Sequence, residues 1–399
     1  MTRERAALYA GCIVAYADMY ITQAVLPVLS SEFGVGAARA GLTVSVVVAA
    51  IAVASPFYGP LSDAAGRRRV MAIATAILSV ATLACAFAQT FGALVALRAA
   101  QGLFVPGVSA VAVAYAGDRF GPRELPSVVG GIISASLVGG LLGRVLAGTI
   151  AAHSSWRTSF VVFAALTAVV AVLLARGLTE GVARERHGLG ASWAGMLRHL
   201  ADPPLLGAYV VGGSLFFGWI GIFTFLPFRL AAPPYGLSTA AISSVFLVYS
   251  AGAVVSPLAG RLSTRIPPRR LITIGLVVEA IGIGVLLARP LPLILLGLAV
   301  LVAGAMTAQA IAPAFVNVTA RTAKGGANAL YLTAYYVGGT LGASLPGLAL
   351  QAAGWKAVVA CCAAAVGVAL LANALLCGRA PRGVGAGEAG AGEAAARTL

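Results

Sequence analysis

The chain has 399 residues, of which 60% are hydrophobic and only 10% are charged, and its mean hydropathy is +0.96. A soluble domain carries about 25% charged residues, so the polar surface available here is too small to cover a water-soluble globule. The formal net charge of +15 does not indicate a nucleic-acid partner, because the basic residues lie in short gaps between apolar runs. The composition therefore predicts a protein embedded in the lipid bilayer.

Twelve apolar runs are long enough to span a membrane, which takes about 20 apolar residues. In chain order they cover 7–28, 39–61, 69–88, 91–116, 125–151, 157–177, 204–229, 239–262, 269–289, 291–317, 326–352 and 355–377. The first run continues past Asp18 to Val28, which favours a retained span over a cleaved signal peptide. The sequence thus predicts an all-α membrane protein with twelve transmembrane helices.

The longest gap between spans falls at the middle of the chain and divides it into two halves. We predict an N-terminal six-helix bundle at 1–177, a cytoplasmic linker at 178–203, a C-terminal six-helix bundle at 204–378 and a disordered cytoplasmic tail at 379–399. The tail is expected to be disordered because it is a low-complexity segment of Gly, Ala and Glu.

The positions of Lys and Arg predict the orientation in the membrane. With the N-terminus inside, the gaps on the cytoplasmic side hold 20 of the 27 basic residues, and the gaps on the other side hold five. The remaining two, Arg98 and Arg144, lie inside spans. This bias predicts a multi-pass protein of the plasma (inner) membrane with both termini in the cytoplasm.

The two halves resemble each other at a nearly constant separation of about 200 residues, which indicates an internal repeat. The matching pairs are GGLLGRVLAG (139–148) with GGTLGASLPG (338–347), GPLS (59–62) with GRLS (260–263), and Leu26-Pro27 with Leu226-Pro227. Because each half has an even number of spans, both halves insert with the same orientation. We therefore predict two bundles related by a pseudo-twofold axis along the membrane normal.

Two short motifs carry a family resemblance. Residues 59–68 fit the pattern Gly-x-Leu-x-Asp-x-x-Gly-Arg-Arg at Gly59, Leu61, Asp63, Gly66, Arg67 and Arg68. Arg98-Ala-Ala-Gln101-Gly102 fits the pattern Arg-x-x-x-Gly in the fourth span. With these motifs, twelve spans and a central linker, nearly the whole chain resembles the major facilitator superfamily of transporters.

The resemblance implies a secondary transporter whose two halves rock to expose a central cavity to each side of the membrane in turn. Spans 1, 4, 7 and 10 line that cavity in the family. We expect a proton-coupled efflux antiporter that exports a drug or metabolite, because Gly143-Arg144 in a glycine-rich fifth span is similar to a sugar or drug exporter branch. A monomer would suffice for this mechanism.

Two alternatives stay open at this point. Antiporters of the family often carry proline where Arg144 stands, which leaves room for a proton symporter or facilitator that imports an anionic metabolite. The alternative from another class is a non-transporting membrane sensor or scaffold with the same fold.

An enzyme is not expected, because we find no GxSxG, HExxH or GxxxxGK[ST] motif and no metal-type cysteine spacing. No metal and no cofactor are predicted, and the proton gradient is the expected energy source.

Four ionisable residues fall inside spans, where they are costly and usually functional: Asp18, Arg98, Arg144 and Glu279. Counted at about 1.5 Å per residue, the first three lie at similar depths, so we expect them to share one chamber that serves proton coupling or substrate binding. The structural alternatives are a fixed Asp18–Arg98 ion pair and capping of helix carbonyls by Arg144. Glu279 lies in the peripheral ninth span, so a packed, protonated or hydrogen-bonded role is expected there.

Further polar and aromatic residues are candidates for the cavity wall. Thr22 and Gln101 share a helical face with Asp18 and Arg98, whereas Gln23, five residues past Asp18, is turned away from it. The tentative set is Tyr20, Thr22, Gln23, Gln101, Phe216, Trp219, Phe223, Asn328, Tyr331 and Tyr335. An aromatic wall of this kind suits an amphipathic organic substrate.

The motif at 59–68 is also a candidate gate on the cytoplasmic side. The resemblance implies that Asp63 faces the N-terminal end of the eleventh span near Gly325, and that Arg67 pairs with Asp118. These contacts would close the cytoplasmic side and break when it opens. The second-half copy has Thr264 where Asp63 stands, so this gate is expected on one side of the repeat only.

Overall fold

The computed structural model describes residues 2–121, 123–180, 198–321 and 324–378. The described residues form helices joined by short connections, with no strand among them. Part of the predicted linker (181–197) and the whole predicted tail (379–399) lie outside the described residues.

The first half of the chain forms six spans, two of which are interrupted. Its helices are α1 (Arg3–Tyr20), η1 (Gln23–Val25), α2 (Leu26–Glu32), α3 (Ala37–Ala65), α4 (Arg67–Ala86), α5 (Phe91–Phe104), α6 (Pro106–Arg119), α7 (Leu125–His153) and α8 (Trp156–Gly177). Together α1, η1 and α2 make span 1, and α5 and α6 make span 4. Both interruptions precede a segment with proline in its first turn, where the missing N–H of proline costs least.

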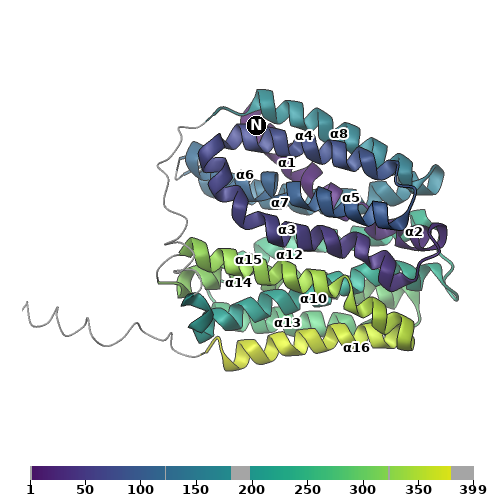
Figure 1. Ribbon diagram of the computed structural model, residues 1–399. Coiled ribbons are helices and arrows are strands. Elements are labelled where there is room, and N and C mark those ends of the chain that lie inside the picture. The colour runs from purple at the N-terminus through teal and green to yellow at the C-terminus, as the bar shows by residue number, and fades with distance from the viewer. Residues whose placement is uncertain (1, 122, 181–197, 322–323, 379–399) are drawn as a thin grey trace, which may run out of the picture.

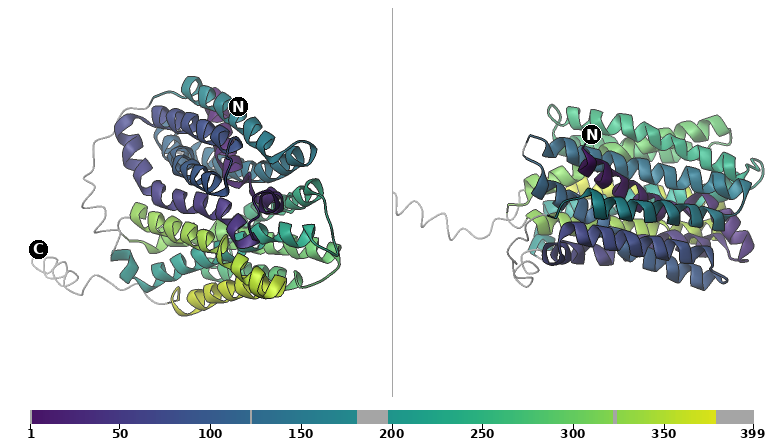
Figure 2. Two further views of the ribbon diagram at one scale, coloured as in Figure 1. Left: turned by 45° about the vertical axis from the view of Figure 1, so that its right-hand side comes forward. Right: turned by 90° about the horizontal axis from the view of Figure 1, so that it is seen from above.

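The second half also forms six spans, but its interruptions fall in other spans than those of the first half. Its helices are η2 (His199–Ala201), α10 (Pro203–Ala231), α11 (Thr239–Val245), η3 (Phe246–Tyr249), α12 (Ser250–Leu262), α13 (Pro268–Val285), α14 (Leu291–Thr319), α15 (Lys324–Gly342) and α16 (Leu345–Leu375). A 3₁₀ turn, η3, interrupts span 8 between α11 and α12. Figure 2 shows the two halves as separate groups of helices, purple to teal and green to yellow.

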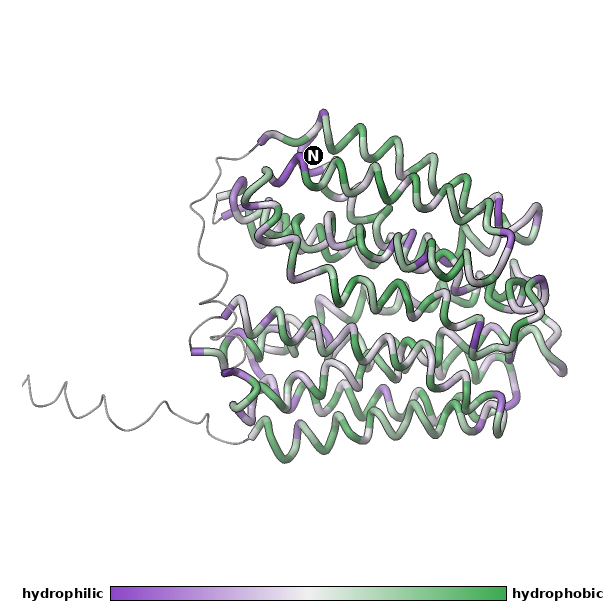
Figure 3. The backbone as a smooth tube through the Cα atoms, viewed as in Figure 1, coloured by the Kyte–Doolittle hydropathy of each residue, from purple (hydrophilic) through white to green (hydrophobic). Residues whose placement is uncertain are grey.

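Ten helical segments in the described chain are long and apolar enough to cross a membrane. The last of these, 324–375, leaves helical geometry at Ala353 and Gly354, where the chain turns back, so it makes two spans (Figure 1). The remaining span is α13, the ninth in chain order, which carries Arg269, Arg270 and Glu279 among its 18 residues. The twelve-span prediction is confirmed, and Figure 3 shows hydrophilic segments gathered at the two ends of the molecule.

Glycines set how closely equivalent helices pack in the two halves. A Cβ atom at Gly143 of α7 would collide with the backbone oxygen of Ala17 in α1, so only glycine allows this approach. In the same way, a Cβ at its repeat partner, Gly342, would lie 2.5 Å from the backbone oxygen of Phe217 in α10. The aligned glycine motifs therefore mark one packing contact that occurs twice, between spans 1 and 5 and between spans 7 and 11.

The two halves meet at one end of the molecule. We call the end that holds Arg3 and Cys377 the terminal end, and the opposite end the far end. At the far end, a Cβ at Gly41 would lie 2.6 Å from the backbone oxygen of Ala343 across the interface. At the terminal end, α3 and α15 diverge, and a Cβ at Gly325 would meet nothing within 4 Å (Figure 1). The halves are thus in close contact at the far end and farther apart at the terminal end.

Candidate functional site

The break in span 1 is held by Arg98. Because α1 ends at Tyr20, its last carbonyl groups have no donors from a following helical turn. Arg98 of α5 donates to the backbone oxygens of Asp18 and Met19, both at 2.7 Å, and to that of Thr43 at 3.0 Å. The guanidinium is fully buried, so it satisfies backbone groups that lipid could not.

The carboxylate of Asp18 points into the N-terminal bundle, away from the other half. It accepts hydrogen bonds from the hydroxyl groups of Thr82 on α4, at 3.2 Å, and Thr167 on α8, at 2.9 Å. Gln101 donates to Thr82 at 2.6 Å and accepts from Arg98 at 2.8 Å. The four spans 1, 3, 4 and 6 are therefore joined by one buried hydrogen-bond network, which we call the Asp18 network.

The structure brings Asp18 and Arg98 together but not as an ion pair between side chains. Arg98 contacts the main chain of Asp18, and the two side chains are connected through Gln101 and Thr82. Arg144, which we expected in the same chamber, belongs to a second cluster. The expectation of one shared chamber was wrong, because depth along a helix does not fix the direction of a side chain.

The second cluster, which we call the Arg144 cluster, lies where the two halves meet. Arg144 of α7 donates to Gln23 Oε1 at 2.5 Å and to the backbone oxygen of Gly140 at 2.6 Å. Its guanidinium carbon lies 3.6 Å from the ring centre of Tyr20 and 4.5 Å from that of Tyr249, which comes from the other half. The Arg144 cluster therefore combines a buried cation with aromatic faces from both bundles.

Gln23 connects the two halves directly. Its amide nitrogen donates to the hydroxyl of Thr224 on α10 at 3.0 Å, while its oxygen accepts from Arg144. The sequence argument turned Gln23 away from the cavity because it assumed a continuous helix. The break after Tyr20 removes that assumption and places Gln23 at the interface. Thr22, next to it, is buried with no hydrogen-bond partner for its hydroxyl in the described chain.

The second half contributes an aromatic wall. The Phe216 ring stacks on Tyr335 with centres 4.0 Å apart, and Tyr331 stacks on Tyr335 in turn. Trp219 donates from its ring nitrogen to the hydroxyl of Tyr249 at 2.7 Å. The same Tyr249 ring lies 4.5 Å from that of Phe223, centre to centre. The predicted stripes on spans 7 and 11 thus pack against each other and reach the Arg144 cluster through Tyr249.

Two of the predicted cavity residues lie elsewhere. Gln101 belongs to the Asp18 network inside the N-terminal bundle, so it does not line the interface. Asn328 donates to Asn317 at 2.5 Å and to the backbone of Lys324, near the terminal end of α15. Each of these two side chains contacts a neighbouring helix, but that helix belongs to the same half of the molecule.

Glu279 is fully buried in the C-terminal bundle, and neither carboxyl oxygen has a hydrogen-bond partner in the described chain. A Cβ at Gly218 would lie 3.3 Å from one of these oxygens and 3.0 Å from Val366. With the repeat offset, Gly218 corresponds to Asp18 and Val366 to Thr167. Each half therefore buries one carboxyl group in an equivalent place, but only the first half surrounds it with hydroxyl groups.

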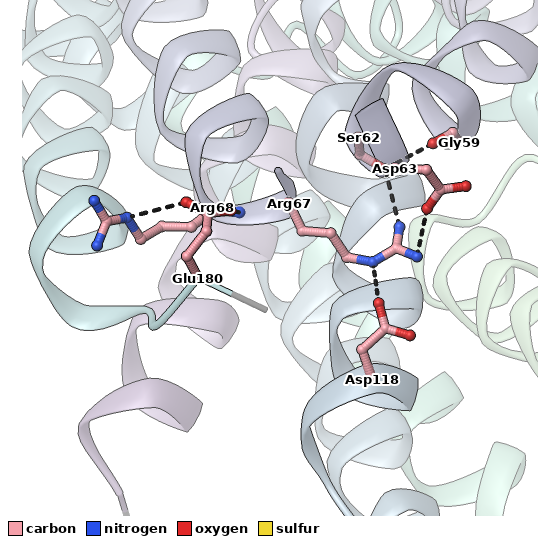
Figure 4. A network of polar contacts seen from close by, with 7 residues as sticks. All are labelled: Gly59, Ser62, Asp63, Arg67, Arg68, Asp118 and Glu180. Carbon is pink, nitrogen blue, oxygen red and sulfur yellow. Dashed lines mark hydrogen bonds and ion pairs between the residues drawn. The ribbon is translucent and has the colours of Figure 1, made fainter. Parts of the chain in front are cut away.

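The motif at 59–68 forms a cluster of ion pairs at the terminal end (Figure 4). Arg67 pairs with Asp63 at 2.7 Å, with Asp118 of α6, and with the hydroxyl of Ser62 at 2.9 Å. Arg68 pairs with Glu180 across 3.6 Å. The expected Arg67–Asp118 contact is present, so Arg67 at the start of span 3 joins span 4 through Asp118 and span 2 through Asp63.

Asp63 itself contacts Arg67 and no residue of α15 within the described ranges. Gly66, with a φ of 91°, forms the turn between α3 and α4, and a Cβ there would collide with Glu180. The predicted contact between Asp63 and the start of the eleventh span is therefore not made among the described residues. It stays a prediction for a state in which the terminal end is closed.

Sequence reasoning missed several residues of both clusters. Thr82 and Thr167 are the hydroxyl donors to Asp18, and Thr224 and Tyr249 bring the second half to Gln23 and Arg144. A threonine in an apolar span is a weak signal, because its hydroxyl usually bonds its own helix backbone. Tyr249 stands where span 8 is interrupted, a feature without a marker such as proline at that point.

Comparisons with known proteins agree with this architecture. The family model of the Major Facilitator Superfamily matches residues 8–255 and 230–397. The inner membrane transport protein YnfM of Escherichia coli (strain K12) is 30% identical over 380 residues, covering 94% of this chain and 90% of its own. An uncharacterized MFS-type transporter, YybF of Bacillus subtilis (strain 168), is 27% identical over 88% of both chains.

Solved transporter structures share the fold at low sequence identity. A bacterial homologue of the human lysosomal transporter Spinster, in an inward-facing and unoccupied conformation, has a TM-score of 0.77 at 16% identity and covers 94% of this chain and 95% of its own. A D-xylose–proton symporter has a TM-score of 0.76 at 17% identity and covers 94% of this chain and 96% of its own. From its fold, its motifs and these matches, the chain belongs to the Major Facilitator Superfamily of membrane transporters.

Proposed function

We propose that the protein is a proton-coupled secondary transporter that exports a small organic molecule, a drug or a metabolite, by antiport. The terminal end, with both termini, faces the cytoplasm in this proposal, in line with the excess of Lys and Arg there. The structure then represents an inward-facing state of a bacterial inner-membrane protein that works as a monomer.

The Asp18 network is the observation that carries the proton coupling. The Thr82 hydroxyl has one proton and two acceptors in reach, Asp18 at 3.2 Å and the backbone oxygen of Leu78 at 2.8 Å. When Asp18 takes up a proton, its carboxyl group becomes a weaker acceptor, and Thr82 is free to donate to Leu78. The hydrogen bond that Gln101 donates to Thr82 and the one that Arg98 donates to Gln101 then change their geometry.

This readjustment reaches the interface through the break in span 1. Arg98 holds the backbone of Asp18 and Met19, and the chain arrives at Gln23 four residues after Met19. Gln23 bonds Arg144 on one side and Thr224 of the other half on the other. A proton on Asp18 would thereby shift the balance between the two arrangements of the halves, which is what coupling requires.

Export by antiport rests on the resemblance of the glycine-rich span 5, with Gly143-Arg144, to an exporter branch of the family. Gly143 lets α7 lie against the backbone of α1, and a Cβ at Gly148, further along, would collide with Ser243 of the other half. Span 5 thus contacts the other half at the far end, and its glycines let it pack closely against span 1, which carries Asp18. The second candidate, proton symport or facilitated import, uses the same parts and differs in the direction of the two fluxes.

Flux measurements in proteoliposomes test this proposal. A panel of organic molecules is screened for uptake, and the transported compound is followed together with internal pH under an imposed proton gradient. Opposed fluxes of protons and substrate support antiport, and parallel fluxes indicate symport. Equilibration that ignores the gradient would overturn proton coupling.

A further inference from the structure

We propose that the Arg144 cluster is the binding site for the negative charge of the substrate, and that the substrate is an organic carboxylate with a flat, apolar body. The inference rests on the proposed transport function, because it names the substrate class of the same cavity. It concerns a different cluster from the one that carries the proton, so the two can be tested apart.

The charge of Arg144 is not balanced within the described part of the chain. The side chain is 2% exposed, and its partners there are an amide oxygen, a backbone oxygen and aromatic rings. Arginines at the ends of the molecule pair with carboxylates instead, as Arg67 does with Asp118 and Arg157 with Glu32. A buried guanidinium without an anion is costly, and such a group in a span usually serves a ligand or an ion.

Packing alone does not require a cation at this place. In the second repeat the motif residue that corresponds to Arg144 is Ala343, which follows the same close helix contact at Gly342. The contact at Gly342 forms with alanine at the next position, so this kind of contact does not need an arginine there. The arginine is therefore an addition to the repeated scaffold, placed where the halves meet and separate.

The surroundings of Arg144 select the shape of an anion. Tyr20 and Tyr249 lie over the guanidinium and Trp219 bonds Tyr249, and these side chains are 8%, 9% and 7% exposed against 2% for Arg144. An aromatic or other flat body gains contact with the rings, and a guanidinium binds a carboxylate with two parallel hydrogen bonds. A neutral amide of the same shape keeps the ring contacts but loses the charge.

Matched acid and amide pairs test the proposal on the purified full-length protein. Benzoate, 4-hydroxybenzoate, phenylacetate and hexanoate are each compared with the corresponding amide by thermal shift and by tryptophan fluorescence. We expect at least one aromatic acid to bind at least tenfold more tightly than its amide in the wild-type protein. Hexanoate should bind more weakly, because it lacks a flat body.

Variants at position 144 show whether the preference for acid over amide depends on Arg144. Arg144→Gln should abolish the preference for acid over amide, and Arg144→Lys should weaken acid binding while keeping the preference, because it retains the charge but not the planar fork. Arg157→Gln removes a half-exposed arginine at the far end and serves as the control that leaves the preference unchanged. Gel filtration of each variant shows whether it is folded, and Arg144→Lys keeps the test decisive if Arg144→Gln is not.

Two results would overturn the proposal: equal or absent binding of every acid and amide pair, or an acid preference that survives in Arg144→Gln. The proton role is judged separately with Asp18→Asn, which should lose uphill transport and keep the acid preference. Acid preference together with wild-type uphill transport by Asp18→Asn would leave the anion site standing and remove the proposed proton carrier.

Discussion

Two buried arginines of the same half have different partners and therefore different expected roles. Arg98 donates to two backbone oxygens at the break of span 1 and to one in α3, whereas Arg144 faces aromatic rings and the other half. Both were visible in the sequence as charges inside apolar runs. Their partners were not, because the direction of a side chain depends on helix breaks and on neighbours distant in sequence.

Replacing Arg98 should destabilise the protein. Arg98→Leu leaves the backbone oxygens of Asp18 and Met19 at the break without a donor and removes a bond to that of Thr43 in α3, at a cost of about 2–5 kcal/mol in the free energy of unfolding. The melting temperature of the purified variant should fall clearly below that of the control Arg157→Leu, which removes a half-exposed arginine at the far end. Equal melting temperatures would show that Arg98 does not hold the break.

Glu279 should behave in the opposite way. Since neither carboxyl oxygen has a hydrogen-bond partner in the described chain, Glu279→Met removes a desolvated polar group and leaves no donor unpaired. We expect an equal or higher melting temperature and unchanged transport. Lost transport in a folded Glu279→Met protein would show that this carboxyl group takes part in function, in contrast to a packing role.

At the scale of helices, the repeated glycine motif was visible in the sequence, and equivalent glycines make the same close contact in each half. The helix breaks were less predictable. Span 8 changes to a 3₁₀ turn at Phe246–Tyr249 without a proline there, and span 1 breaks several residues before Pro27. These breaks are favoured by tertiary bonds from Trp219 and Arg98, which no local pattern reveals.

The contact between α1 and α7 can be tested with two glycines of the same helix. Gly143→Ala places a methyl group against the backbone oxygen of Ala17 and should cost about 1–3 kcal/mol in the free energy of unfolding. Gly130→Ala meets nothing within 4 Å and should be neutral or slightly stabilising, because alanine favours a helix. Equal thermal stabilities of the two variants would contradict the close contact.

At the scale of the whole molecule, the two halves have the same arrangement of spans but bury different kinds of functional side chain. The first half buries Asp18, Arg98 and Arg144, and the second half buries aromatic rings and Glu279. The family resemblance predicted the fold and the cavity between bundles. It did not predict which end is closed, because that depends on contacts such as Gly41 with Ala343, between residues about 300 positions apart.

The ion pairs at the terminal end should govern the rate of closure. Asp63 pairs with Arg67 in the open state, and its predicted second contact with the start of α15 would form only on closing. Asp63→Asn should therefore slow transport several-fold without lowering the amount of protein in the membrane, and Asp63→Glu should restore most of the rate. Wild-type flux in Asp63→Asn, measured at equal protein levels, would leave Asp63 without a role in the gate.

The central claim is that Asp18 carries the proton that drives transport. The most direct measurement compares wild-type protein with Asp18→Asn in proteoliposomes, following substrate accumulation against its own gradient while a proton gradient is imposed. The wild-type protein should accumulate substrate, and Asp18→Asn, which cannot gain or lose a proton, should only equilibrate it. Undiminished accumulation by Asp18→Asn would contradict the account.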